Sequence, residues 1–185
     1  CTSFTSNCIE VTVVDDPSVT VDPIDEDICV GGTAVFDATA TGGTPSLTYQ
    51  WQYDSGGGMF VNVSNGTPTG ATYSGATSTS LTVSTNGSIA VNNYDYRLLV
   101  NASGLACDQV ISDTATMNVF ADPVIDVEPT GSEICEGETE TLNVTASGTA
   151  PSGSLLLQWE FRSPPGSGSW ANAPGTNTDP SYTTP

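Results

Sequence analysis

Apolar and polar residues alternate most clearly at positions 47–53, where Leu47, Tyr49, Trp51 and Tyr53 are separated by Thr or Gln. Because neighbouring side chains of a strand point to opposite faces, this period of two predicts a half-buried β-strand. The same pattern recurs at 155–161, with Trp159 in the place of Trp51. A strand that occurs twice indicates a repeated domain.

The other alternating stretches are short, and Gly, Pro, Asn or Asp residues bound them. They lie at 9–13, 18–21, 33–41, 60–63, 81–83, 94–100 and 115–119. Short strands of this number, separated by turn residues, are typical of a β-sandwich. With 19 Gly, 12 Pro and many Thr and Val residues, the sequence has almost no helical signal. We therefore predict an all-β fold.

The repeat has a fixed spacing of 106 residues, which separates Cys1 from Cys107, Pro17 from Pro123 and Cys29 from Cys135 (107 − 1, 123 − 17 and 135 − 29). The two tryptophans are 108 residues apart (159 − 51) because a longer turn at 148–154 replaces the turn at 42–46. We expect residues 1–14 to be the last strand of one repeat, 15–120 a complete domain and 121–185 the first half of the next. The sequence would then be a window on a longer tandem array.

The five cysteines can be interpreted once the repeat is laid over them. Cys29 and Cys107 belong to the same complete repeat, and we predict a disulfide between them. Cys1 and Cys135 occupy the corresponding positions of the neighbouring repeats, so their partners are expected outside the sequence. Cys8 has no counterpart in the next repeat. Two alternatives stay open for it, a local disulfide with Cys1 and no disulfide with Cys1. A disulfide indicates an oxidising, extracytoplasmic setting, and the lack of His and of a Cys-x-x-Cys motif disfavours zinc and thiol redox chemistry.

Charge narrows the function classes further. Two Lys or Arg residues against 21 Asp or Glu residues give a net charge of −19, which repels nucleic acid. No apolar run approaches the roughly 20 residues that a membrane-spanning helix needs, so membrane insertion is not expected. We interpret the acidity as a source of solubility and mutual repulsion on a crowded surface, with divalent-cation binding as the alternative.

Acidic residues are concentrated at the two junctions between repeats. Asp15, Asp16, Asp25 and Asp27 at the first junction are candidate calcium ligands, because several hard oxygens there would hold the ion and stiffen an array. No Asp-x-Asp-x-Asp-Gly loop is present, so solvated linker charge is the competing interpretation. No other cofactor is expected.

Several motifs occur together in a fixed order: Cys-Val-Gly-Gly-Thr at 29–33, the Trp51 strand with its Gly-rich turn at 49–58, residues 73–83, Tyr-Asp-Tyr-Arg-Leu at 94–98, and Cys107. Together they resemble a bacterial immunoglobulin-like repeat of the very large secreted surface proteins of Bacteroidota. The resemblance covers the complete domain and both partial ones. It implies tandem immunoglobulin-like β-sandwiches, export commonly by type IX secretion, and use as a stalk of cell-surface adhesins, those of gliding motility included, or as an accessory module of secreted enzymes. Asp113-Thr-Ala115 also fits the O-glycosylation consensus described for Bacteroidota, which makes Thr114 a candidate site.

The chain departs from the antibody pattern at the inter-sheet disulfide. Leu98 stands where the second cysteine would lie, and no cysteine precedes Trp51 in the preceding strand. We expect Phe36 and Leu98 to fill that space, with Trp51 between the sheets and Tyr96 as the candidate corner tyrosine. A surface platform for sugars is the alternative for the aromatic residues. The predicted core residues are Phe36, Tyr49, Trp51, Tyr96, Leu98 and Trp159.

Catalysis finds little support. His and Lys are missing, and no Gly-x-Ser-x-Gly, phosphate-loop or His-Glu-x-x-His pattern occurs. We therefore expect a non-catalytic, extracellular array that acts as a stalk or filament segment of a cell-surface adhesin. Its partners would be neighbouring repeats of the same chain, with surface glycans or other cells bound through domains outside this sequence. The alternatives are a carbohydrate- or protein-binding module of a secreted hydrolase and a subunit of a self-assembled extracellular fibre.

Overall fold

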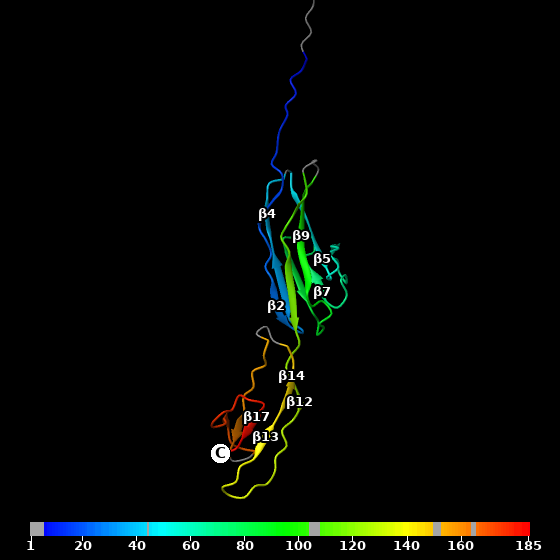
Figure 1. Ribbon diagram of the computed structural model, residues 1–185. Coiled ribbons are helices and arrows are strands. Elements are labelled where there is room, and N and C mark those ends of the chain that lie inside the picture. The colour runs from blue at the N-terminus through cyan, green and yellow to red at the C-terminus, as the bar shows by residue number, and fades with distance from the viewer. Residues whose placement is uncertain (1–5, 44, 104–107, 150–152, 164–165) are drawn as a thin grey trace, which may run out of the picture. The chain divides into compact units, whose positions relative to one another are not determined.

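The computed structural model describes residues 6–43, 45–103, 108–149, 153–163 and 166–185 (Figure 1). The chain divides into two compact units, residues 1–119 (unit 1) and 120–185 (unit 2). Among the described residues the regular elements are β-strands and no helix occurs. The all-β prediction is therefore confirmed.

Unit 1 consists of two sheets that face each other. One contains β3 (Thr33–Asp37), β8 (Ser80–Ser84) and β7 (Thr72–Ser74) in that order, and the pair β1 (Ser18–Val21) and β4 (Thr39–Thr41) extends it, since β4 follows β3 after one residue. The other contains β2 (Glu26–Cys29), β11 (Ala115–Phe120), β9 (Tyr94–Ala102), β5 (Leu47–Asp54) and β6 (Val61–Asn62) in that order, with β10 (Val110–Ile111) also paired to β9. Figure 1 shows β5 and β9 side by side at the centre of this second sheet.

The register of the strands explains the core. β5 and β9 pair antiparallel over eight residues, from Leu47 opposite Ala102 to Asp54 opposite Asp95. Alternate residues of both strands face the other sheet, where Phe36 pairs with Leu81 between β3 and β8. Burial of these inward residues forms one apolar cluster between the two sheets. The alternation of apolar and polar residues in the sequence thus corresponds to the alternation of inward and outward side chains in the strands.

A glycine is required where the chain passes from β4 to β5. Gly42 has φ of +79°, and a Cβ there would collide with the backbone carbonyl of Asp16. Gly148, 106 residues later (148 − 42), also has a positive φ, and a Cβ there would lie 2.9 Å from the Cα of Pro123 and 3.2 Å from the carbonyl oxygen of Asp122. The Gly therefore allows the turn to pack against the segment that precedes the first strand, in the same way in both units.

Unit 2 repeats part of this arrangement. Its strands are β12 (Val124–Val127), β13 (Thr141–Asn143), β14 (Thr145–Ser147), β15 (Glu160–Arg162), β16 (Trp170–Asn172) and β17 (Ser181–Thr183). They form the antiparallel pairs β12–β14, β13–β17 and β15–β16. These match β1–β4, β3–β8 and β5–β6 of unit 1. Among the described residues of unit 2, no strand matches β9, β10 or β11.

Two expected strands differ in the structure. The alternating stretch at 155–161 is a strand only from 160, where β15 meets β16. Residues 155–159 lack a partner like β9, which pairs with the corresponding part of β5. Residues 6–17 contain no strand either, because no other described strand pairs with them. That residues 1–14 close a preceding repeat therefore stays a prediction.

Candidate functional site

The centre of unit 1 is the buried side chain of Trp51. Its indole Nε1–H donates to the backbone carbonyl of Ser78 at 2.9 Å, which joins β5 to the segment before β8. The ring centroid of Phe36 lies 6.4 Å from that of Trp51, and Phe36 stacks on Tyr96 at 4.9 Å. Leu98 faces Trp51 across the β5–β9 pair. Aromatic packing and one indole hydrogen bond thus hold the two sheets together.

The structure places the predicted core residues as follows. Phe36, Trp51, Tyr96 and Leu98 are fully buried in the cluster, whereas Tyr49 packs against it half-buried. Trp159 of unit 2 is also half-buried. Phe36 and Leu98 both pack in this cluster, so bulky apolar side chains occupy the space between the sheets without a disulfide among the described residues.

Unit 2 repeats the hydrogen bonds of Trp51 around Trp159. The indole N–H of Trp159 donates to the carbonyl of Asp179 at 2.7 Å. Its backbone N–H donates to Asn177, as that of Trp51 does to Ala76. The ring of Trp159 stacks on Tyr182 with centroids 5.8 Å apart. The tryptophan is therefore held from the same sides in both units.

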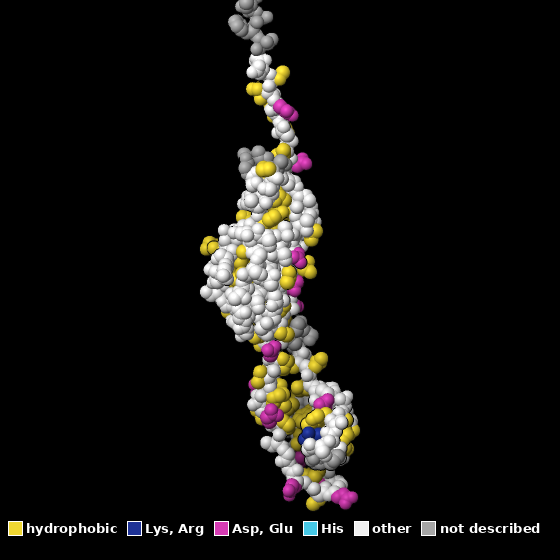
Figure 2. Space-filling view, turned by 180° about the vertical axis from the view of Figure 1, so that it is seen from behind, with side chains coloured by type: hydrophobic (Ala, Val, Ile, Leu, Met, Phe, Trp, Pro, Cys, Tyr) yellow, Lys and Arg dark blue, Asp and Glu magenta, His cyan; other side chains and the backbone are white. Residues whose placement is uncertain are grey.

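One side of Trp159, however, is open. An apolar pocket of about 270 Å³ lies beside it, and Leu142, Phe161, Ala173 and Tyr182 also line this pocket. In unit 1 the corresponding side of Trp51 is covered by β9, whose Leu98 lies opposite Trp51. Figure 2 shows hydrophobic side chains gathered on unit 2, whereas the face of unit 1 in this view is mostly polar. We call this apolar side of unit 2, formed by Leu157, Trp159 and Phe161 with the pocket, the open face.

The junction acids are not assembled into a metal site. The carboxylates of Asp25 and Asp27 accept hydrogen bonds from the backbone N–H of Thr116 (2.7 Å) and the side-chain amide of Asn118 (2.8 Å). Asp22 accepts one from the backbone N–H of Asp113 at 2.8 Å. Among the described residues no group of three or more His, Cys, Asp or Glu side chains is placed to hold a metal ion. The structure thus does not bring Asp15, Asp16, Asp25 and Asp27 together.

These three hydrogen bonds instead fix β2 beside β11. The three acceptors bind residues 113, 116 and 118 in the order of the chain, so β2 runs parallel to β11. The carboxylate of Asp25 thereby gives the backbone N–H of Thr116 in β11 a hydrogen-bond acceptor in place of a backbone carbonyl. The sequence places these acids at the junction, but their role becomes visible only when β2 and β11 are seen to be neighbours.

A second carboxylate role concerns the turn after β5. The buried carboxylate of Asp54 accepts hydrogen bonds from the backbone N–H groups of Gly56, Gly57 and Gly58 at 3.1, 2.9 and 2.7 Å. Burial acts to raise the pKa of Asp54, but the hydrogen bonds, that from Gly57 first, outweigh it and leave the pKa lowered. The sequence analysis treats 54–58 as a turn only. The signal for this role is an Asp followed closely by three Gly residues, whose unhindered backbones can converge on one carboxylate.

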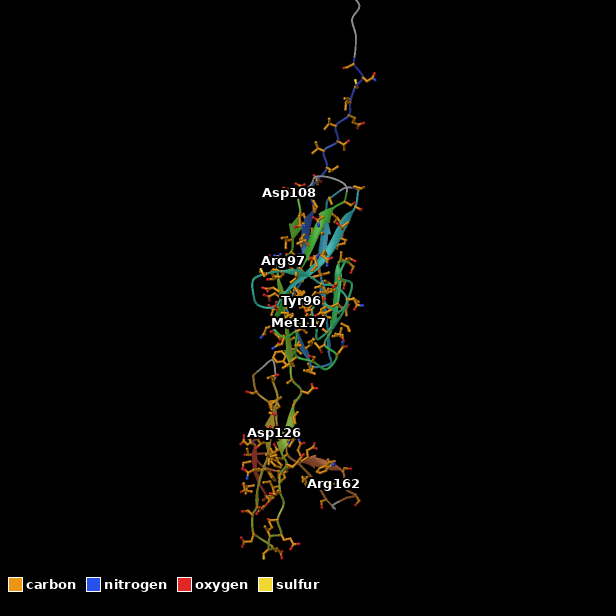
Figure 3. All side chains as sticks on the ribbon, turned by 90° about the vertical axis from the view of Figure 1, so that its right-hand side faces the viewer. Tyr96, Arg97, Asp108, Met117, Asp126 and Arg162 are labelled. Carbon is orange, nitrogen blue, oxygen red and sulfur yellow. The ribbon has the colours of Figure 1, made fainter. Side chains whose placement is uncertain are left out.

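Two buried tyrosine hydroxyls, those of Tyr73 and Tyr96, lie near each other, but neither makes a hydrogen bond of good geometry among the described residues. Burial raises the pKa of Tyr73 to about 12, and it also raises that of Tyr96 above its ordinary value. The assignment of Tyr96 as a corner tyrosine is not supported, because a corner tyrosine donates its hydroxyl to the backbone. Tyr96 instead stacks on Phe36 and serves as a core side chain (Figure 3).

Both arginines stack on aromatic rings. The guanidinium of Arg97 lies 3.8 Å from the ring centroid of Phe60 and donates from Nε and Nη2 to Gln52 Oε1 at 3.1 and 2.9 Å. The guanidinium of Arg162 lies 4.8 Å from the ring centroid of Trp170. In each unit the arginine thus follows an inward aromatic residue, Tyr96 or Phe161, and points to the opposite face of its strand.

The cysteines remain separate in the described part of the chain. Cys8, Cys29 and Cys135 are exposed, and no disulfide joins them there. Cys1 and Cys107 lie outside the described residues, so the pairing of Cys29 with Cys107 stays a prediction. Cys29 ends β2, two residues after Asp27, which binds Asn118 beside Met117. Peptide mapping without reduction distinguishes a disulfide between Cys29 and Cys107 from a disulfide to another chain or repeat.

Thr114 lies exposed between β10 and β11, so its hydroxyl is accessible; its glycosylation stays a prediction. In the part of the chain that is described, no helix is long and apolar enough to cross a membrane.

Comparison with known proteins supports the fold. No protein-family model matches the sequence, and no curated protein matches it. Among solved structures, an I-band fragment of titin, I67–I69, matches 92% of this chain with a TM-score of 0.59 and 11% identity. Extracellular domains 3–5 of Drosophila OTK match 92% with a TM-score of 0.54 and 18% identity. Immunoglobulin domains 1–5 of Sidekick-1 match 80% with a TM-score of 0.50 and 16% identity.

The chain has a tandem immunoglobulin-like fold. This chain spans 55%, 52% and 28% of the titin, OTK and Sidekick-1 structures, respectively. At these low identities the likeness concerns the fold alone. The predicted immunoglobulin-like fold class is therefore confirmed.

Proposed function

We propose that this chain is a non-catalytic segment of an extracellular array of immunoglobulin-like repeats, which acts as a stalk or filament segment of a cell-surface adhesin of the Bacteroidota type. The observation that carries the proposal is the repeated tryptophan network, in which Trp51 and Trp159 donate to matching carbonyls in consecutive units. A repeated scaffold with a repeated glycine turn is what an array needs to space distant parts of a surface protein.

The surface chemistry agrees with this role. The net charge of −19 favours solubility and disfavours contact between neighbouring chains on a crowded surface. The partners would be the adjacent repeats of the same polypeptide, and binding to glycans or other cells would belong to domains outside this sequence. The location would be the extracellular face of the cell.

Surface labelling tests this proposal. An antibody raised against the purified chain should label intact cells of the source organism, and external protease should remove the label. The purified chain itself should give no signal on a glycan array, because a spacer holds a binding domain without binding the target. Label that appears only after permeabilisation would contradict the extracellular location, and specific glycan binding would indicate a binding module instead.

One observation favours a second candidate, the subunit of a self-assembled fibre. Among the described residues, the alternating segment at 9–13 pairs with no strand and its apolar side chains are exposed, and Trp159 of unit 2 lines an apolar pocket. A fibre subunit presents two such complementary surfaces. Electron microscopy of the purified chain should show filaments if this candidate is correct, whereas a stalk segment should stay dispersed.

A further inference from the structure

Four prolines of the chain directly follow an aspartate. The bonds Asp16–Pro17 and Asp122–Pro123 lie 106 residues apart (122 − 16), which is the period of the repeat, and each immediately precedes the first strand of a unit, β1 or β12. Asp22–Pro23 lies inside unit 1 between β1 and β2, and Asp179–Pro180 lies inside unit 2 before β17. Two of the four bonds therefore stand at the start of a repeat, where a break leaves every strand intact.

An Asp–Pro bond is open to cleavage in acid without an enzyme. The proline nitrogen takes up a proton, an oxygen of the aspartate carboxylate attacks the backbone carbonyl carbon of the same residue, and the C–N bond breaks. The cyclic anhydride that forms takes up one water molecule, which leaves one chain that ends in Asp and one that starts with Pro. Because the attacking and the attacked group belong to one residue, the reaction is favoured over direct attack by water.

The side chains of the two aspartates at the repeat boundaries are free for this attack. Asp16 and Asp122 are exposed, and neither carboxylate accepts a hydrogen bond among the described residues. The glycines that pack against their backbone, Gly42 and Gly148, belong to turns whose sequences contain no titratable residue. One further acid, Asp15, stands directly beside them in the sequence.

Unit 1 also contains a matched bond whose aspartate is not free. Asp22 is exposed and Pro23 is buried, just as Asp16 is exposed and Pro17 is buried. The Oδ1 atom of Asp22, however, accepts the backbone N–H of Asp113 at 2.8 Å. Attack on its own carbonyl carbon would break this hydrogen bond. The fold therefore gives two bonds of the same chemistry, six residues apart (22 − 16), attacking groups of different freedom.

We propose that Asp16–Pro17 and Asp122–Pro123 are sites of non-enzymatic scission in acid, at which the array divides into single repeats. Scission at both bonds releases residues 17–122, which contain every strand of unit 1 from β1 to β11, so the fragment keeps its fold. The consequence, a stalk that shortens by whole repeats in acidic surroundings, rests on the proposed array function. The reactivity of the two bonds concerns this chain alone.

Mass spectrometry of the whole chain during incubation in acid tests the proposal. The pH is the lowest at which circular dichroism still shows the native chain, and the same incubation in denaturant gives the ratio of scission rates that the local sequence sets. Relative to this reference, we expect the folded chain to break at Asp16–Pro17 about tenfold faster than at Asp22–Pro23. This is roughly the factor that one hydrogen bond to a charged group corresponds to. Asp122–Pro123 should break as well, so that fragment 17–122 accumulates.

Asp16→Glu and Asp122→Glu are the matched variants, because they keep the charge while the longer side chain has to close a larger ring. Each should stop scission at its own bond and leave the other bond unchanged. Equal relative rates at Asp16–Pro17 and Asp22–Pro23 in the folded chain, or scission at both boundaries that persists in the Glu variants, would overturn the proposal. The rates are measured on the purified chain, so a negative result in surface labelling would contradict the array function without changing them.

Discussion

Trp51 and Leu98 lie directly opposite each other on β5 and β9, and neither side chain reaches solvent. Trp159 makes the same indole hydrogen bond as Trp51 but has no described residue in the place of Leu98. The tryptophan is therefore oriented by the segment that precedes β8 in unit 1 and β17 in unit 2, whereas in unit 1 a later strand, β9, completes its burial. This separation explains why two nearly identical stretches differ in exposure.

Replacing Trp51 by alanine should destabilise unit 1 by about 3–5 kcal/mol, because it leaves a large cavity between the sheets and removes the hydrogen bond to Ser78. Thermal melting measures the loss, and Trp51→Phe provides a milder variant if the alanine variant does not fold. Trp170→Ala is the control, since the side chain of Trp170 is mostly exposed. An unchanged midpoint for Trp51→Ala would mean that the core does not depend on this ring.

Tyr96→Phe should leave the stability of unit 1 unchanged or raise it by up to about 1 kcal/mol, since it removes a buried hydroxyl without a described hydrogen-bond partner while the stacking on Phe36 remains. The effect should grow above pH 10. A buried tyrosine whose pKa is raised by folding contributes stability that is fully present below its pKa in the unfolded chain. This contribution is lost as the pH rises through its pKa in the folded chain.

Melting curves from pH 8 to pH 11 compare this variant with Tyr49→Phe, whose ring is only half-buried. Tyr73→Phe should act in the same direction as Tyr96→Phe, because burial raises the pKa of Tyr73 to about 12. A marked destabilisation by Tyr96→Phe would reveal a hydrogen bond that the hydroxyl makes in solution.

The strands of unit 1 could be predicted largely from alternation. The stretches around Trp51, Tyr96 and Met117 are strands in the structure. Their apolar residues occupy alternate positions and therefore lie on one face of the strand. β2, β7 and β10 could not be predicted in this way. They have two to four residues each, and their positions depend on the strand beside them. β2 in particular is held by Asp25 and Asp27, whose polar side chains gave no strand signal.

The functional residues were harder to predict than the fold, for the same reason. The sequence places Asp25 and Asp27 in an acidic cluster, which favours a calcium hypothesis as long as their neighbours are unknown. Their hydrogen bonds join residues 91 positions apart, and no local pattern encodes such a distance. The Asp54 turn is the opposite case, because an Asp before three Gly residues is a local signal that can be read from the sequence.

Asp54→Asn should lower the melting temperature at neutral pH, because a carboxylate binds the three glycine N–H groups more strongly than a neutral amide does. The pKa of Asp54 is lowered from an ordinary value of 3.8, so its contribution is present above that pH and is lost as the pH falls through the folded pKa. The difference between Asp54→Asn and the unchanged chain should therefore shrink at strongly acidic pH. Asp37→Asn, on the exposed side of β3, is the control. A pH-independent difference would mean that the charge of Asp54 has no part in holding the turn.

The last prediction distinguishes two roles for the acidic residues in and just before β2, hydrogen bonding to β11 and calcium binding. If Asp25 acts by binding the Thr116 N–H, Asp25→Ala should cost about 1 kcal/mol whether or not calcium is present. Asp16→Ala removes the same charge from a residue with no side-chain hydrogen bond in the described part of the chain, and it should cost less.

We expect the melting temperature of the unchanged chain to be the same in millimolar calcium as in a chelator at the same ionic strength. The reason is that Asp25 and Asp27 already bind residues of β11. A ligand that binds only the folded state would instead raise the midpoint with concentration. A calcium-dependent rise that disappears in both Asp25→Ala and Asp16→Ala would therefore show a shared cation site. Asp25 would then have to exchange its backbone partner for the ion, and β2 would be held to β11 by the metal instead of by the carboxylate alone.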